Sequence, residues 1–221
     1  MTRATQDACP DTCLPEPVAG KSARAWIVFL AVVTLACGAD LISKSVVFRQ
    51  LLSAPATQQR LADILSNPDV RIRHDEQFTR AVLRETRASR RVCFGLSLSL
   101  STNPGVVFGF DSIPRLVVNL ITIAMSLAVL GFFLLSPARA TWLHLALGLI
   151  LGGALGNLYD RLFSEVPLGP LMPIRYHVRD FIDCSDLGYN YIFNAADAWL
   201  VMGVAILAIH WLGSGKKGMG K

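Results

Sequence analysis

The stretch Phe193-Asn194-Ala195-Ala196-Asp197 runs directly into the apolar segment 198–209, and this junction decides the fold. Asn194 and Asp197 are three residues apart, so a helix places their side chains on one face. The segment that follows is apolar enough to span a bilayer, for which a helix needs about 20 residues. Ionisable groups at membrane depth are costly and usually functional. Asp197 is therefore a candidate site residue that needs a partner.

The composition predicts a membrane protein. Of the 221 residues 52% are hydrophobic and only 17% are charged, which is too apolar for most soluble domains. The apolar residues form four blocks, each close to the length of a membrane span. These blocks lie at about 25–48, 116–135, 141–158 and 192–212. We predict an all-α polytopic membrane protein, a bundle of four transmembrane helices.

The predicted domain organisation is one membrane domain, 25–212, between two tails. Residues 1–24 are polar and proline-containing, which is typical of a disordered tail, and 213–221 form a basic tail. A cleaved signal peptide ending near Cys37 is an alternative for the first block. Since more apolar sequence follows Lys44 and three further blocks come later, we predict that the first block stays as a span.

Residues 53–91 differ from the rest of the chain. Apolar residues at helical spacing and many arginines indicate an insert of one or two amphipathic helices lying on a surface, with a solvated charged loop as the alternative. The stretch 92–100 alternates apolar with small or polar residues, the pattern of a half-buried strand.

Charge and cysteine content exclude some classes of function. The formal net charge of +5 is explained by lysines and arginines that flank spans and meet anionic lipid, and no basic face for nucleic acid remains. The five cysteines lack metal-ligand spacing, so we predict neither a metal site nor a cofactor.

Polar residues in the first span form one candidate pair. Asp40 and Lys44 are four residues apart and can pair on one helical face. A pair that snorkels to the membrane surface is the alternative.

The third span carries a second polar group. Gly148, Gly152 and Gly156 recur every four residues, which favours close packing of another helix. Immediately afterwards, Asn157, Asp160 and Arg161 follow at i, i+3 and i+4. From the residue types we expect Asp160 and Arg161 to form a structural ion pair.

Asp180 is the candidate partner of Asp197. Its neighbours Val178, Phe181 and Ile182 predict partial desolvation, which raises the pKa of a carboxyl group. Two acids in a dry site share one proton, as in an aspartic peptidase: the carboxylate activates water, and the protonated acid polarises the scissile carbonyl. Asp183 and Asp186 lie in more polar surroundings and are predicted to be surface acids.

Five motifs together resemble those of lipoprotein signal peptidase, also called signal peptidase II. They are Asp40-x-x-Ser43-Lys44, Asn103-x-Gly105-x-x-Phe108, Gly152-Gly153-Ala154-Leu155-Gly156-Asn157-x-x-Asp160-Arg161, Val178-x-Asp180-Phe181 and Phe193-Asn194-x-Ala196-Asp197. The resemblance covers about 25–212, without the tail and the Arg-rich insert.

The resemblance implies an aspartic endopeptidase of the bacterial inner membrane. It would cut diacylglyceryl-modified prolipoproteins just before the lipidated cysteine, with Asp180 and Asp197 as the catalytic dyad and a small extracytoplasmic β subdomain beside the spans. It also implies supporting or substrate-contacting roles for the remaining motif residues. These are Asp40, Lys44, Asn103, Gly105, Phe108, Gly156, Asn157, Asp160, Arg161, Asn194 and Ala196.

The sequence departs from the family pattern in three places, one of which is the insert at about 53–91, longer than expected for the family. Pro104, Val106 and Val107 are bulkier than usual around the Asn-x-Gly motif, and Arg179 stands where an apolar residue is common. On an extended segment Arg179 would point away from Asp180.

Other functions remain as alternatives. An ion-coupled transporter would use intramembrane acids as a relay, and a scaffold without catalytic activity would use them for helix packing. The positive charges are nearly balanced between the two sides, and the long first loop favours cytoplasmic termini. We expect a monomer whose partners are prolipoproteins and membrane lipids, not nucleic acid.

Overall fold

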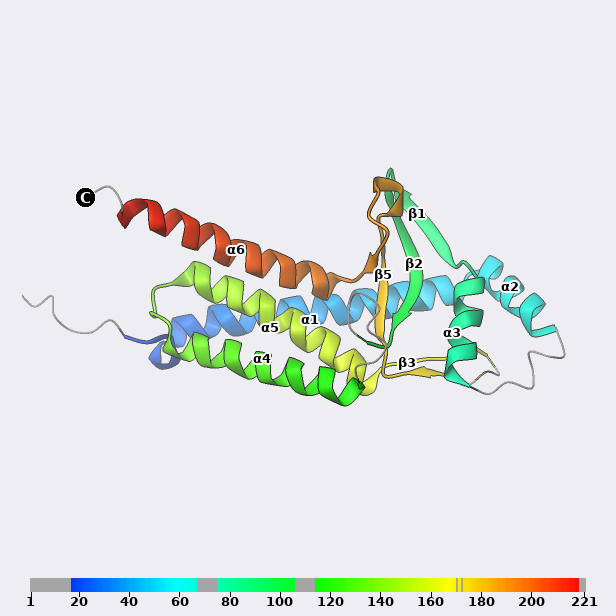
Figure 1. Ribbon diagram of the computed structural model, residues 1–221, viewed down its shortest axis with the longest axis horizontal. Coiled ribbons are helices and arrows are strands. Elements are labelled where there is room, and N and C mark those ends of the chain that lie inside the picture. Colours follow the sequence, from blue (N-terminus) through cyan, green and yellow to red (C-terminus); the bar gives the residue numbers. More distant parts are fainter. Residues whose placement is uncertain (1–16, 67–74, 106–113, 170, 172, 219–221) are drawn as a thin grey trace, which may run out of the picture.

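The computed structural model describes residues 17–66, 75–105, 114–169, 171 and 173–218 (Figure 1). Residues 1–16 of the predicted tail, Phe108, and the terminal 219–221 lie outside the described residues.

Among the described residues, four helices are long and apolar enough to cross a membrane, at the four predicted places. They are α1 (Ala23–Leu52), α4 (Arg115–Leu135), α5 (Thr141–Phe163) and α6 (Ala195–Gly218). α5 packs against each of the other three helices. In its apolar stretch 56% of the residues are buried, compared with 28% or less in the other three helices. α5 is therefore the central helix (Figure 1), and Gly156, Asn157 and Asp160 near its end are buried.

The glycines of α5 bring it close to α1, as predicted. A Cβ atom on Gly148 would lie 2.9 Å from the side chain of Val32, and one on Gly152 would lie 2.7 Å from Cβ of Ala36. Neither position has room for a side chain. The close approach brings the α1 residue Asp40 against the last turns of α5.

A four-stranded antiparallel sheet lies across one end of the bundle, with strand order β1-β2-β5-β6. The strands are β1 (Ser89–Cys93), β2 (Leu96–Asn103), β5 (Val178–Asp183) and β6 (Ile192–Phe193). A second, two-stranded sheet joins β3 (Glu165–Val166) to β4 (Ile174–Arg175). The described residues also form two short 3-10 helices, η2 (Ala19–Lys21) and η4 (Ser185–Leu187).

The prediction of one strand over 92–100 is wrong, because a hairpin turn interrupts it. Cys93 pairs with Leu96, and Gly95 between them has φ +75°, a backbone conformation that glycine adopts without strain. The predicted alternation of burial is also absent over 96–100: Leu96 to Leu98 are all half-buried and Ser99 and Leu100 are both buried, while every residue of β1 is exposed.

The insert contains the two predicted amphipathic helices, α2 (Pro55–Ser66) and α3 (Glu76–Glu85). Their apolar faces pack on the rest of the protein, with Leu61, Val82 and Leu83 buried, while their polar faces stay exposed on its surface. Leu61 of α2 and Leu83 of α3 belong to a core that also holds Phe48 from α1 and Phe181 from β5. The insert thus packs on the same strand that carries Asp180.

The ends of the membrane domain also differ from the prediction. Residues 17–24 are structured: Ala19 is fully buried and its N–H donates to the carbonyl of Ser136 at 2.7 Å. The fourth helix begins at Ala195, three residues later than predicted, because Ile192 and Phe193 form β6.

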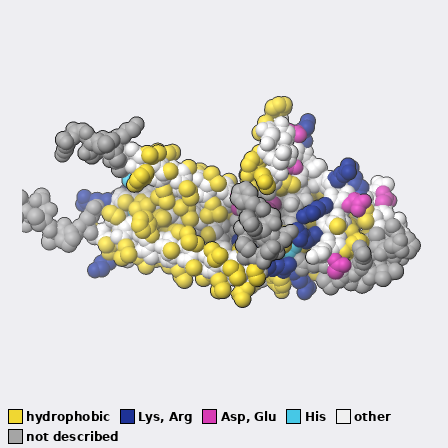
Figure 2. Space-filling model, viewed as in Figure 1, with side chains coloured by type: hydrophobic (Ala, Val, Ile, Leu, Met, Phe, Trp, Pro, Cys, Tyr) yellow, Lys and Arg dark blue, Asp and Glu magenta, His cyan; other side chains and the backbone are white. Residues whose placement is uncertain are grey.

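The surface shows an apolar bundle and a charged end (Figure 2). Hydrophobic side chains cover the visible face of the bundle, while charged side chains gather at the end that carries the sheet and the insert, with further Lys and Arg at the opposite end.

Candidate active site

α6 begins with a reciprocal cap made by Asn194 and Asp197. The Asn194 side-chain oxygen accepts a hydrogen bond from the Asp197 N–H at 3.1 Å, and the Asp197 carboxylate accepts one from the Asn194 N–H at 3.3 Å. This is a capping box, in which the N-cap residue and the third helical residue satisfy each other's backbone donors. The cap fixes the Asp197 carboxylate at the helix N-terminus, where a negative charge is favoured.

Asp180 lies on β5, opposite Ser101 of β2, and is only 5% exposed. Burial raises the pKa of Asp180 to about 7, and the negative charge of Asp197 contributes to this rise. The Asn194 amide, which donates to Asp180 Oδ1 at 2.6 Å, opposes it. Asp180 therefore holds its proton up to near-neutral pH.

Two asparagine side chains connect the acids. Asn194 Nδ2 donates to Asp180 Oδ1 and, at 3.1 Å, to Asn157 Oδ1. Asn157 Nδ2 then donates to Asp197 Oδ1 at 2.8 Å. The acids are thus joined by three consecutive hydrogen bonds, and their charges interact.

The partners of each amide fix its orientation. Asn157 Oδ1 lies 3.0 Å from the ammonium group of Lys44, which can only donate, so the NH₂ group of Asn157 must face Asp197. The oxygen of Asn194 accepts a backbone N–H, so its NH₂ group must face Asp180. Both acids consequently receive a side-chain donor in a set arrangement.

Lys44 stands at the centre of a buried charge network. Its Nζ lies 2.6 Å from Asp40 Oδ2 and 3.2 Å from Asp160 Oδ2, and all three side chains are fully buried. The predicted pairing of Asp40 with Lys44 is confirmed, and complete burial excludes a pair that snorkels to the surface. A buried ammonium with two carboxylates and an amide oxygen is well satisfied, which rigidifies its surroundings.

Asp160 does not form the predicted pair with Arg161. Besides Lys44, its partner is Arg179, whose Nη2 and Nε lie 2.7 and 3.1 Å from Asp160 Oδ1, while the Arg179 N–H donates to Oδ2 at 3.0 Å. Adjacent residues on a helix do not face each other, which is why the sequence neighbour is not the partner. As predicted for a strand, Arg179 points away from Asp180.

Asp40 supports the start of α6. Its Oδ1 accepts a hydrogen bond from the Ala196 N–H at 2.9 Å, satisfying a further donor at the helix N-terminus. A Cβ atom on Gly156 would lie 2.5 Å from Asp40 Oδ2 and would displace this carboxylate. Gly156 and Ala196 are therefore needed for their small size and backbone, respectively.

Arg161 and the Asn103–Gly105 turn form the side of the site. Asn103 ends β2, and its Oδ1 accepts a hydrogen bond from the Gly105 N–H at 3.1 Å. Arg161 Nη2 lies 3.5 Å from the Gly105 carbonyl, and its charge interacts with those of Asp180 and Asp197. The structure thus gathers all the predicted site residues that it describes around one centre.

An apolar cavity of about 480 Å³ opens beside Asp197. Phe193, Tyr189, Val201 and Met202 line it together with Cys184 and Ala198. It extends along α6, so an apolar ligand in it would lie directly beside the carboxylate.

Sequence reasoning missed the contacts that join distant elements, namely Lys44 to Asn157, Arg179 to Asp160 and Asp40 to Ala196. The one available signal was the density of charged residues within apolar helices, which requires partners. Within the described residues, no group of three or more His, Cys, Asp or Glu side chains could hold a metal ion.

Comparison with known proteins gives one family. The profile described as "Signal peptidase (SPase) II" matches residues 32–213. Lipoprotein signal peptidase of Pseudomonas fluorescens (strain Pf0-1) is 38% identical over 128 residues, which cover 55% of this chain and 69% of that protein. Lipoprotein signal peptidase of Rhodococcus jostii (strain RHA1) is 35% identical over 116 residues, which cover 52% of each chain.

Solved structures share the fold. A structure titled as a bacterial membrane enzyme at 2.3 Å resolution superposes with a TM-score of 0.59 at 21% identity, covering 94% of this chain and 98% of that one. A second, at 1.9 Å resolution, gives a TM-score of 0.56 at 22% identity and covers 90% and 97% of the two chains.

Proposed function

Because the chain belongs to the signal peptidase II family, we propose that it is an aspartic endopeptidase that removes signal peptides from diacylglyceryl-modified prolipoproteins. The cut falls just before the lipidated cysteine, and Asp180 and Asp197 activate the water. Membership of this family supports the conclusion that the protein is a bacterial membrane protease that processes lipoproteins. The aspartic mechanism and the dyad are our additions.

The observation that carries the proposal is the unlike environment of two linked acids. Asp180 is buried on a strand with a pKa raised to about 7, whereas Asp197 is less buried, lies at a helix N-terminus and accepts donors from Asn157 and Asn194. Environments that separate the proton affinities of two carboxyl groups assign an acid and a base.

The proposed reaction follows from that assignment. The Asp197 carboxylate takes a proton from water, and the water oxygen bonds to the scissile carbonyl carbon. Protonated Asp180 donates to the carbonyl oxygen, which stabilises the negative charge developing there. When the tetrahedral intermediate collapses, the hydroxyl proton returns to Asp180 as the carbonyl re-forms, the C–N bond breaks, and the proton held by Asp197 passes to the leaving amine.

The surroundings of the dyad suit a lipid-linked substrate. The apolar cavity along α6 lies beside Asp197, where an acyl chain or the apolar signal segment would be desolvated. We assign Arg161, Asn103 and Gly105 to the substrate backbone, since they present a guanidinium and a turn beside the acids. Lys44, Asp40 and Asp160 hold the surrounding helices and β5 in place.

We also propose the cell inner membrane as the location, with both termini in the cytoplasm and the sheet and insert outside it. The dyad lies at the end of the bundle that carries the sheet, so this orientation exposes it to the face on which lipid-modified precursors are processed. We also propose that the protein acts as a monomer, since one chain supplies all the described residues of the proposed site.

The test is cleavage of a diacylglyceryl-modified precursor and its unmodified twin by the purified protein. We expect the modified precursor alone to release its signal peptide, and Asp180→Asn or Asp197→Asn to lower the rate by at least about a hundredfold, the scale of one acid or base catalyst. Asp186→Asn should retain the rate, because Asp186 is an exposed acid in the segment between β5 and β6. Near-normal cleavage by either dyad variant would end the assignment.

A further inference from the structure

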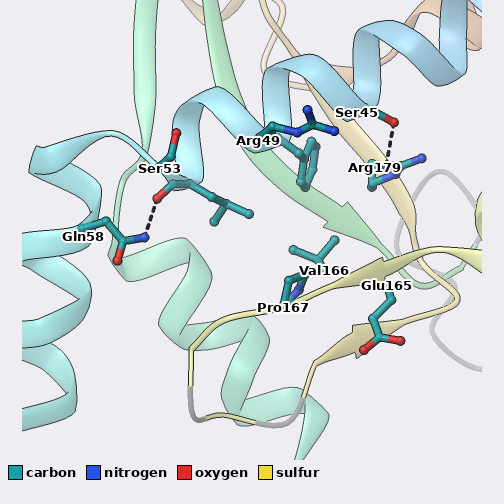
Figure 3. A pocket seen from close by; sticks show the side chains of 10 residues that line it. Ser45, Arg49, Ser53, Gln58, Glu165, Val166, Pro167 and Arg179 are labelled. Atoms are coloured by element: carbon teal, nitrogen blue, oxygen red, sulfur yellow. Dashed lines mark hydrogen bonds between the residues drawn. The ribbon is translucent and has the colours of Figure 1, made fainter.

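A second cavity lies on the far side of β5 from the dyad and has no part in the proposed reaction. It encloses about 530 Å³ between the C-terminal end of α1, β5 and β3 (Figure 3). The side chains that matter for its chemistry are Ser45, Arg49, Ser53, Arg179, Phe48 and Val166.

The cavity is positively charged, because it contains two arginines and, among the described residues, only one of them, Arg179, is paired with an acid. Within the described part of the chain, the exposed Arg49 side chain has no hydrogen-bond or ion-pair partner. Arg179 is held by Asp160, but its Nη1 still faces the cavity, 3.5 Å from Ser45 Oγ. Glu165 is the only acid among the described lining residues; it turns away in Figure 3 and pairs with Arg175 at 3.3 Å.

The depth of the cavity follows from the length of α1. This helix has 30 residues and is thus about 45 Å long, whereas the hydrocarbon core of a bilayer is about 30 Å thick. Gly148 of α5 lies against Val32 of α1 and Gly156 lies against Asp40, so Phe163, the last residue of α5, is level with Val47 of α1. Arg49 therefore lies only about 3 Å beyond the end of the spanning helix α5. This places it in the headgroup layer, which extends about 5–7 Å beyond the hydrocarbon core on each side. Phe48 and Val166 supply apolar walls on the same cavity.

We propose that this cavity binds the phosphate group of an anionic phospholipid, with Arg49 as the main ligand and Arg179 Nη1 and the serine hydroxyls as further donors. A guanidinium fork with neighbouring hydroxyl groups matches phosphate oxygens. The apolar walls accept the glycerol and the first acyl carbons. A lipid bound here would lie behind the Arg179–Asp160–Lys44 network and would be separate from the substrate, which carries a diacylglyceryl group without phosphate.

The experiment measures lipid binding by the full chain in a neutral, phosphate-free detergent. Native mass spectrometry and thermal unfolding are recorded with phosphatidylglycerol, with diacylglycerol, and with inorganic phosphate. Phosphatidylglycerol should form a one-to-one complex and raise the unfolding temperature. Arg49→Gln should weaken this binding at least about tenfold, because a charge-assisted contact is lost.

The control is Arg90→Gln, which removes the same charge from an exposed position on β1 outside the cavity. It should bind phosphatidylglycerol like the unchanged protein. Ser53→Asp, which adds a carboxylate to the cavity, should abolish binding by repulsion. Equal weakening by the Arg90 and Arg49 variants, or equal binding of diacylglycerol, would overturn the proposal. Protection by inorganic phosphate at the same concentration would overturn the lipid source in favour of free phosphate at this site.

Discussion

Replacing Asp180 with Asn should make the protein more stable at alkaline pH, although it removes a proposed catalytic group. Burial is the main reason that the pKa of Asp180 is raised to about 7 in the folded protein, while an unfolded chain gives about 3.9. The difference of about 3 units corresponds to about 4 kcal/mol at 1.36 kcal/mol per unit, an upper bound because Asp180 is coupled to Asp197.

The sign follows from proton binding. Between about pH 4 and pH 7 the unfolded chain has released the proton while the folded protein keeps it, so the free energy of unfolding falls as pH rises through this window. Above pH 7 the full cost of a buried, ionised Asp180 is present. Asp180→Asn removes that cost, so the two proteins should be equally stable near pH 4 and increasingly different up to pH 8.

The assay is unfolding in detergent micelles, followed by tryptophan fluorescence at pH 4 to 8. Asp183→Asn is the matched control on the same strand, with the opposite sign. Hydrogen bonds from Ser185 and Ser99 lower the pKa of Asp183, so its carboxylate stabilises the fold above about pH 4 and this contribution is lost as pH falls. A gap between Asp180→Asn and the unchanged protein that does not grow with pH would refute a protonated Asp180.

Three further changes test the frame around the dyad. Asp160→Asn should destabilise the protein by about 3–5 kcal/mol, because the fully buried Lys44 and the half-buried Arg179 lose their shared carboxylate; normal unfolding of this variant would contradict the network. Gly156→Ala should displace Asp40 and lower the cleavage rate, while Gly131→Ala, where a Cβ meets nothing within 4 Å, should leave the rate unchanged. Leu83→Ala should cost about 2–5 kcal/mol in unfolding experiments, because this side chain is 1% exposed in the core under the insert; a negligible loss would show that the insert packs independently.

The sequence predicted those parts of the site that depend only on neighbouring residues, such as the length of an apolar block or the spacing along a helix. The four spans follow from the length of apolar blocks, and the shared face of Asn194 and Asp197 follows from helical spacing. The structure adds that these two residues cap the helix reciprocally, a pattern that can be read from residues three apart. Alternation within a strand likewise placed Arg179 and Asp180 on opposite sides.

The partner of Asp160 could not be predicted in this way, and the reason bears on how the site works. Its ligands come from α1 and β5, which are separated from it in sequence by 116 and 19 residues, and nothing local to α5 specifies either. Arg161, the nearest cation in the sequence, is rotated by about 100° on the helix, and its strongest charge interactions are with the two acids of the dyad. The adjacent residues Asp160 and Arg161 thus have different roles. Asp160 neutralises the two cations that hold α1 and β5 in place, which leaves Arg161 available to the acids and to whatever substrate they meet.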